Sequence, residues 1–218
     1  MRARRSVRCP FPMRPLATAL AVLLFSDPLA HAAHAQPTLQ ARSGPTIPVG
    51  DCSESAVRSA ITGAPNGATV DLTALSSCTI TLTAGEIAIG VDQLTVQGPA
   101  DTSLTLSGNN ASRVFHHTGV GLLTLDHLVM TGGNYTKAYD QGKYTVHYGT
   151  GGAVHSEGSV TLSRSTVTGS SVCHSTGSAE YNEGFGGGVF AERDVSVIRS
   201  TVSGNIACGT TEVSLFIL

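Results

Sequence analysis

Tryptophan is absent from this 218-residue chain, aromatic residues make up only 5% of it, and charged residues make up only 13%. No apolar run after residue 35 approaches the roughly 20 residues that a membrane-spanning helix needs. No basic run is interleaved with aromatic side chains, which argues against nucleic acid and anionic membranes as partners. The motifs of serine hydrolases, zinc peptidases and phosphate-binding loops are missing too. The sequence therefore predicts no cofactor and assigns no catalytic residue.

Residues 1–35 have the pattern of a secretory signal peptide. Five arginines precede the short apolar stretch Leu16–Phe25, and small residues offer cleavage sites ending at Ala32 or Ala35. We therefore expect an exported protein that resides outside the cell, at its surface or in the periplasm. Without this segment the chain loses five of 13 basic and one of 15 acidic residues, which leaves a formal charge of −6. Residues 36–50 are expected to form a flexible linker.

Glycine is plentiful, with 25 residues, and the second half of the chain contains a repeat. Residues 151–170 (GGAVHSEGSVTLSRSTVTGS) and 186–205 (GGGVFAERDVSVIRSTVSGN) match at 10 of 20 positions with an offset of 35. A fainter third copy lies at 122–134. Apolar residues recur at every second position over three or four residues, which is the spacing of short strands.

A unit of such short strands cannot bury its own apolar face, but a stack of like units can. Stacking at the repeat offset places equivalent residues about 4.8 Å apart in parallel pairing. The sequence therefore predicts an all-β fold, a parallel β-helix of about five coils over residues 64–218. A β-propeller has a similar period, but its blades need more residues than the exported chain contains.

Residues 51–63 are predicted to form an N-terminal capping α-helix over the open end of the stack. Asp51 followed by Glu54 is a variant of a capping box, and the glycine at the end of the range stops the helix. Val57 and Ile61 lie on one apolar face, which would cover the first coil.

Several segments together resemble the secreted right-handed parallel β-helix repeat proteins of bacteria, the superfamily of pectate-lyase-like enzymes and polymorphic outer-membrane proteins. They are ESAVRSAITGAPNGATVDL, GEIAIGVDQLTVQGP and the GGAV and GGGV units ending in STVTG and STVSGN. The resemblance covers roughly residues 50–205 and implies a right-handed coil. It implies no single activity, because the superfamily contains both enzymes and surface proteins.

The lyase-like members place aspartate pairs and basic residues on one sheet, and no such set is evident here. The nearest acidic and basic candidates are Asp126, Asp140, Arg164 and Arg199. In the repeat, Arg164 and Arg199 share one column above His127. Stacked like charges repel, so we expect this column to face solvent, where water screens it.

Four cysteines remain after removal of the signal peptide, and an even number in an exported chain favours disulfides. Cys173 and Cys208 are separated by the repeat offset, so we expect them to stack in adjacent coils and to form a disulfide. Cys52 would then join Cys78 and tie the helix to the first coil. The alternative is four unpaired thiols. The spacing of the cysteines does not fit a metal site.

Three pairs of residues are predicted to occupy equivalent positions in successive coils. Each is a valine followed by a ring-bearing residue: Val114-Phe115, Val154-His155 and Val189-Phe190. If the valines point inward, Phe115, His155 and Phe190 form an outward ladder that would stack against a sugar or a partner. If the strand is rotated, the three residues belong to the core instead.

Two unrepeated segments, 133–150 and 170–185, interrupt the repeat at the same corner and contain all five tyrosines. Insertions in a stacked-repeat protein gather on one face, often the binding face, and tyrosine is a favoured contact residue. The candidate binding residues are Tyr135, Tyr139, Tyr144, His147, Tyr148 and Tyr181. The alternative is two polar loops that merely pack on each other.

The next glycine pair would fall at about position 221, beyond the last residue of the chain. We therefore expect a truncated or frame-shifted piece of a longer protein, or else an apolar tail, SLFIL, that folds back as a cap. The leading functional hypothesis is an exported, non-catalytic scaffold whose corner loops bind a polysaccharide or a cell-surface partner. The alternatives are a polysaccharide lyase or glycosidase, and a remnant without function.

Overall fold

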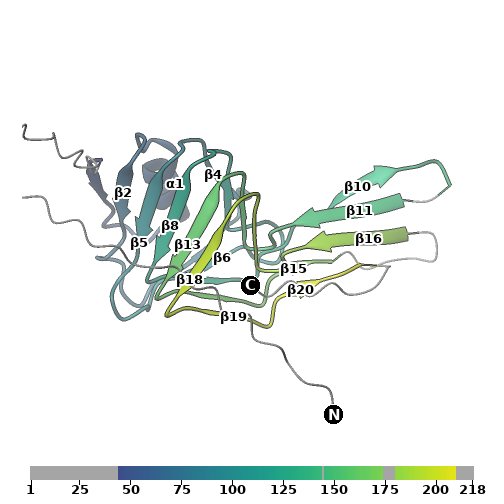
Figure 1. The fold of residues 1–218 in the computed structure, drawn as a ribbon. Helices are drawn as coiled ribbons and strands as arrows, with labels where there is room; N and C mark the ends of the chain where they lie inside the picture. The colour runs from purple at the N-terminus through teal and green to yellow at the C-terminus, as the bar shows by residue number, and fades with distance from the viewer. Residues whose placement is uncertain (1–43, 144, 174–179, 210–218) are drawn as a thin grey trace, which may run out of the picture. The chain divides into compact units, whose positions relative to one another are not determined.

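Short parallel strands and one α-helix make up the part of the chain that the computed structural model describes, namely residues 44–143, 145–173 and 180–209 (Figure 1). The predicted signal peptide, Tyr144 and the apolar tail lie outside this part. The described residues belong to a single compact unit, 41–218. None of their helices is long and apolar enough to cross a membrane.

The chain runs through three sheets in turn, and within each sheet every pairing between neighbouring strands is parallel. Sheet A contains, in spatial order, β1 (Thr46–Pro48), β2 (Ala68–Asp71), β5 (Leu94–Gln97), β8 (Leu122–Asp126), β13 (Ser159–Ser163) and β18 (Val195–Ile198). Sheet B contains β3 (Thr79–Thr81), β6 (Thr105–Ser107), β9 (Val129–Thr131), β14 (Thr166–Thr168) and β19 (Thr201–Ser203). Sheet C contains β4 (Ile87–Ile89), β7 (Phe115–His117), β12 (Val154–Ser156) and β17 (Val189–Ala191).

Strand register follows the repeat that is visible in the sequence. Val160 in β13 pairs with Val195 in β18, and Val167 in β14 pairs with Val202 in β19, each at the offset of 35. The third, fainter copy is confirmed as well, because Leu123 pairs with Val160. The repeat therefore reports how one pass of the chain lies on the next.

Alternate residues of each strand point inward and form one continuous apolar core. Val160, Leu162 and Val167 are at most 1% exposed. Their partners on the last described pass, Val195, Val197 and Val202, are 38%, 43% and 44% exposed. The burial of each pass therefore depends on the pass that lies beside it.

Helix α1 spans Glu54–Thr62, and Val57 and Ile61 pack its apolar face against the core, as the sequence predicts. Its N-cap is Ser53, whose hydroxyl accepts a hydrogen bond from the backbone of Ala56, so the expected capping role of Asp51 is wrong.

Glu54 binds across to the bend between β3 and β4 instead of capping the helix. Its carboxylate accepts hydrogen bonds from the backbone N–H groups of Thr83 and Ala84 and from Arg58. Desolvation raises the pKa of Glu54, but these hydrogen bonds outweigh it and lower the pKa to about 2. Part of the expected linker also belongs to the fold, since β1 pairs with β2 in parallel.

Two disulfides join the pairs that the sequence predicts. Cys52 is bonded to Cys78 with a Cα separation of 6.2 Å, and Cys173 to Cys208 with a Cα separation of 5.1 Å. The first holds the chain just before α1 to the entrance of β3, and the second links two successive passes. Disulfides of this kind indicate an oxidising environment such as the periplasm or the cell exterior.

The corner between sheets A and B carries the column of basic residues. His127, Arg164 and Arg199 all have left-handed backbones, with φ of 53°, 46° and 50°. Arg164 and His127 both contact the carboxylate of Asp126, at 3.0 Å and 2.9 Å. The sequence suggests that water alone screens the repulsion within this column. The structure adds a second factor, because the carboxylate of Asp126 neutralises part of the positive charge.

The outward ladder of rings is present, but one of its expected members is wrong. Val154 pairs with Phe115 and His155 pairs with His116, so Phe115 points inward and is fully buried. Its inward neighbour on the next pass is Val154. The ladder on the outer face of sheet C consists of His116, His155 and Phe190.

Substitution of Phe115 tests this register directly. Because Phe115 lies in the core, Phe115→Ala is expected to lower the free energy of unfolding by about 3–5 kcal/mol. Phe190→Ala, on the outer face, should cost less than about 1 kcal/mol. Urea unfolding of both variants provides the comparison, and equal costs would contradict the register.

A candidate binding site at the base of a projecting sheet

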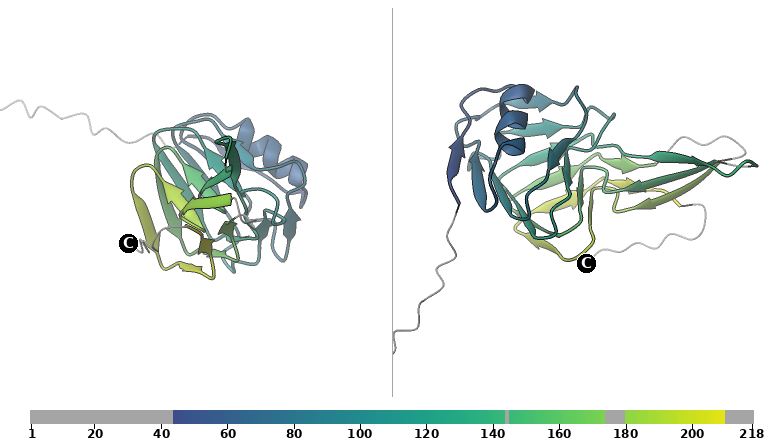
Figure 2. Two further views of the ribbon diagram at one scale, coloured as in Figure 1. Left: turned by 90° about the vertical axis from the view of Figure 1, so that its right-hand side faces the viewer. Right: turned by 90° about the horizontal axis from the view of Figure 1, so that it is seen from above.

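Both tyrosine-bearing insertions contribute strands to a small sheet that stands out from the three main sheets (Figures 1 and 2). It is made of β10 (Lys137–Asp140), β11 (Thr145–Thr150) and β16 (Glu180–Phe185). β10 pairs with β11 in antiparallel fashion, and β11 pairs with β16 in parallel, again at the offset of 35. The insertions are therefore an extension of the stack, which the interpretation as two polar loops missed.

One face of this projecting sheet carries exposed aromatic rings. Cross-strand partners and residues two apart share a face, which places Tyr139, Tyr148 and Phe185 together. They are 43%, 36% and 48% exposed. The rings of Tyr148 and Phe185 lie 5.9 Å apart. We call these three residues the aromatic face.

Of the remaining predicted tyrosines, Tyr181 has its backbone paired with that of Val146. Tyr144 lies outside the described residues. Tyr135 lies elsewhere, at the base of the projecting sheet.

The opposite face of the projecting sheet is covered near its base. His147 and Asn182, which are register partners, are both buried there. Val172 packs against Gly149 and Gly184, so closely that a Cβ added to either glycine would lie within 3 Å of it. Val172 belongs to β15 (Ser171–Val172), which pairs with β20 (Ile206–Ala207). His147, a predicted binding residue, is therefore not on the open side.

Arg113 joins the projecting sheet to sheet C. Although it is only 3% exposed, its guanidinium donates to the Thr150 carbonyl at 2.9 Å and to the Thr150 hydroxyl at 3.2 Å. The guanidinium carbon also lies 3.3 Å from the centre of the Tyr135 ring, a cation–π contact. Thr150 shares the face of Tyr148, so the aromatic face begins at this cluster.

Glu86 supplies the negative charge that compensates buried Arg113. One carboxylate oxygen accepts from Arg113 at 3.0 Å, and the other accepts from His116 Nδ1 at 2.9 Å. Partial burial raises the pKa of Glu86, but the hydrogen bonds from His116 and Arg113 outweigh it and hold the pKa below its usual value. Glu86 is therefore a fixed, ionised hydrogen-bond acceptor.

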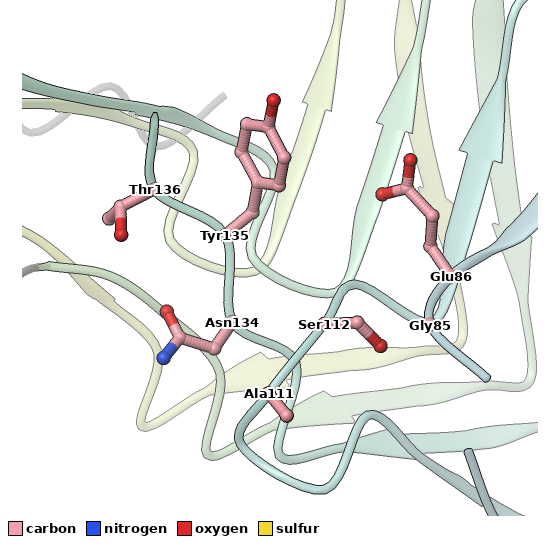
Figure 3. Close-up of a pocket in the computed structure, with 7 residues that line it drawn as sticks. All are labelled: Gly85, Glu86, Ala111, Ser112, Asn134, Tyr135 and Thr136. Atoms are coloured by element: carbon pink, nitrogen blue, oxygen red, sulfur yellow. The ribbon is translucent and has the colours of Figure 1, made fainter. Parts of the chain in front are cut away.

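A cavity of about 380 Å³ lies beside this cluster. The side chains of Tyr135 and Glu86 point the same way from two separate segments of chain, and small or hydroxyl-bearing residues lie between and around them (Figure 3). The lining residues are Gly85, Glu86, Ala111, Ser112, Asn134, Tyr135 and Thr136. The volume lies in the range of small-molecule sites, and the cavity is wide open to solvent.

The ladder of His116, His155 and Phe190 borders the same cluster. Neighbouring ring centres are 5.2 Å and 5.4 Å apart. Burial, followed by the nearby charges of Arg113 and His116, lowers the pKa of His155 to about 4. His155 is therefore neutral near pH 7, and its Nδ1 lies 2.8 Å from the Thr150 hydroxyl, which can donate to it.

A serine–histidine pair inside the core is not a catalytic site. Ser156 Oγ lies 2.7 Å from His117 Nδ1, but both residues are fully buried. His117 Nε2 faces the carbonyl of Val91 at 2.9 Å, so this nitrogen carries the proton and Nδ1 accepts from Ser156. The two side chains satisfy each other's hydrogen-bonding groups on the buried face of sheet C.

The sequence interpretation found Tyr135 and His155 but missed Glu86, Arg113, His116 and Thr150. None of the four lies in a repeated motif, so the alignment of the copies carries no signal for them. Among the described residues, no three histidine, cysteine, aspartate or glutamate side chains lie close enough to hold a metal ion.

Comparison of the chain with known protein families, with curated proteins and with solved structures finds no match. The site combines an exposed aromatic face with a cavity that contains one fixed carboxylate, and Arg113 connects the two through Thr150 and Tyr135.

Loss of the Glu86–Arg113 pair is expected to destabilise the fold in a graded way. Glu86→Gln keeps the shape and one acceptor for Arg113, so it should cost about 1–2 kcal/mol. Arg113→Met leaves the buried Thr150 carbonyl without its donor and should cost about 3 kcal/mol or more. Glu157→Gln, at an exposed carboxylate, is the control and should cost less than about 0.5 kcal/mol in urea unfolding.

Protonation of His155 is expected to make stability depend on pH. The folded-state pKa of about 4 lies below the usual 6.5, so the unfolded chain binds more protons between these values. Stability should be complete above about pH 6.5 and decline as the pH falls toward about 4. His155→Phe should flatten this decline when unfolding is measured across the interval, and an unchanged slope would contradict the role of His155.

Proposed function

We propose that this protein is an exported right-handed parallel β-helix that binds a glycan on the aromatic face of its projecting sheet. The observation that carries the proposal is the group of exposed rings, Tyr139, Tyr148 and Phe185, on one face of a sheet whose other face is covered near its base. Large apolar side chains at such exposure, gathered on one surface, mark interaction sites in soluble proteins.

A glycan suits this surface better than a purely apolar partner does. Flat rings pack against the C–H face of a sugar, while nearby polar groups bond its hydroxyls. Lys137 lies 5.4 Å from the Tyr139 ring, and Glu183 pairs in register with Tyr148, so charged groups of both signs flank the rings. Tyrosine also provides contact area at a small cost in side-chain entropy.

The β-helix itself is supported by the order of the strands. Successive passes visit sheet A, then sheet B, then sheet C, and every pass pairs in parallel with the next. Crossovers between parallel strands are right-handed in about 98% of cases, which supports the proposed hand. The sequence resemblance to secreted β-helix proteins of bacteria agrees with it. Export is supported by the two disulfides, which suit an oxidising compartment.

A lyase or glycosidase receives no comparable support. Asp126 and Arg164, two of the candidates from the sequence, bind each other at the corner between sheets A and B. Asp140 lies on the projecting sheet, which leaves the stack between sheets B and C. The acidic and basic candidates are thus divided between two corners.

Removal of the aromatic face tests the proposal. Tyr148→Ala and Phe185→Ala should each weaken binding to a glycan array or an insoluble polysaccharide by about 10-fold, because each ring contributes about 1–2 kcal/mol of contact. Val120→Ala removes an equally exposed apolar side chain elsewhere and should leave binding unchanged. Unaltered binding by both aromatic variants would refute the proposed surface.

A further inference from the structure

The distribution of charge around the cavity indicates which glycans it can admit, and this step rests on the proposed function. The carboxylate of Glu86 lines the cavity, whereas the guanidinium of Arg113 is buried behind it. Arg113 is 3% exposed and does not line the cavity, whereas Glu86 does line it and its side chain is 28% exposed. A ligand that enters the cavity therefore meets a carboxylate first.

Arg58, the other arginine near this corner, is already engaged. Arg58 donates to the carbonyls of Gly85 and Glu86 and is paired with Glu54 at 2.6 Å. On the projecting sheet, Lys137 is exposed, with its ammonium 5.4 Å from the centre of the Tyr139 ring, and it does not line the cavity. His155 is neutral, as described above. Recognition of a sugar carboxylate usually uses an arginine or lysine that is free to bind it, and no arginine or lysine is among the residues that line this cavity.

The remaining lining groups suit hydroxyls. Ser112, Thr136 and Tyr135 carry hydroxyl groups, which can both donate and accept. Glu86 is held in place by Arg113 and His116, so it can accept from a ligand hydroxyl without first being ordered. Gly85 and Ala111 leave room for a ring. Tyr135 has Arg113 over one ring face, which leaves its other face or its edge for the cavity.

We infer that the cavity binds one uncharged sugar residue of a neutral glycan, whose neighbouring residues pack on the aromatic face. Glu86 accepts hydrogen bonds from the hydroxyls of that sugar. A uronate residue at the same place would bring its carboxylate beside the exposed side of Glu86, while Arg113, buried and already bonded to Glu86, is not free to bind it.

The test compares matched hexasaccharides that differ only in oxidation at C6: gluco- and glucurono-, galacto- and galacturono-, and manno- and mannurono-oligosaccharides. Calorimetric titration of the full secreted chain should show binding of at least one neutral member, and its acidic counterpart should bind at least about 10-fold more weakly. Binding of the neutral member should change little with ionic strength.

Two variants connect the selectivity to the cavity. Glu86→Gln removes the carboxylate charge at constant shape. It should reduce the ratio between the dissociation constants of the acidic and the neutral oligosaccharide by about 10-fold, whereas Glu157→Gln should leave this ratio unchanged. Ala111→Leu fills part of the cavity without altering charge and should weaken neutral binding by about 10-fold. Circular dichroism and thermal melting establish that each variant is folded.

The outcomes separate the two proposals. Binding of acidic members as tightly as neutral ones overturns the charge selectivity and leaves the proposed function standing. Neutral binding that depends on Tyr148 but is unaffected by both Glu86→Gln and Ala111→Leu overturns the role of the cavity alone. If none of the glycans in the panel or on an array binds, both the proposed function and this inference fail.

Discussion

Parallel pairing between each short strand and the strand one pass later is the interaction on which the whole structure depends. Strands of two to six residues contribute too few contacts to be stable alone, so each becomes buried only when its neighbour is in place. Val160 is buried because β18 lies beside it, whereas its partner Val195 is exposed. The candidate site has the same origin, since Glu86, Arg113 and Thr150 come from three successive passes and meet only through this stacking.

The sequence predicts those parts of the fold in which like residues stack on like. The offset of 35 therefore predicts the pairing of β13 with β18 and the position of the second disulfide. Where two consecutive residues are both apolar, the alternation of apolar and polar residues no longer indicates which side chain points inward. Val114 and Phe115 are both buried, so the ring ladder is misread by one position and His116 is overlooked.

The projecting sheet and the charged cluster could not be predicted in this way. β11 and β16 obey the same offset, but of their six paired positions only Gly149 and Gly184 carry the same residue. Their pairing relies on backbone hydrogen bonds, which any sequence provides, so the sequence alignment does not reveal it. Arg113 and Glu86 are 27 residues apart, and neither lies in a repeated motif. Their partnership follows from the need of a buried charge for compensation, and this need becomes visible only when burial is known.

The disulfide between Cys173 and Cys208 has a consequence for how the chain threads. RSTVTGS and RSTVSGN present nearly the same surface, so a strand displaced by one whole turn would find almost equivalent neighbours. A covalent loop that encloses one repeat length removes that degeneracy, because the two sulfurs meet only when no turn has been skipped or doubled. The bond between Cys173 and Cys208 therefore fixes covalently which pass of the chain lies beside which.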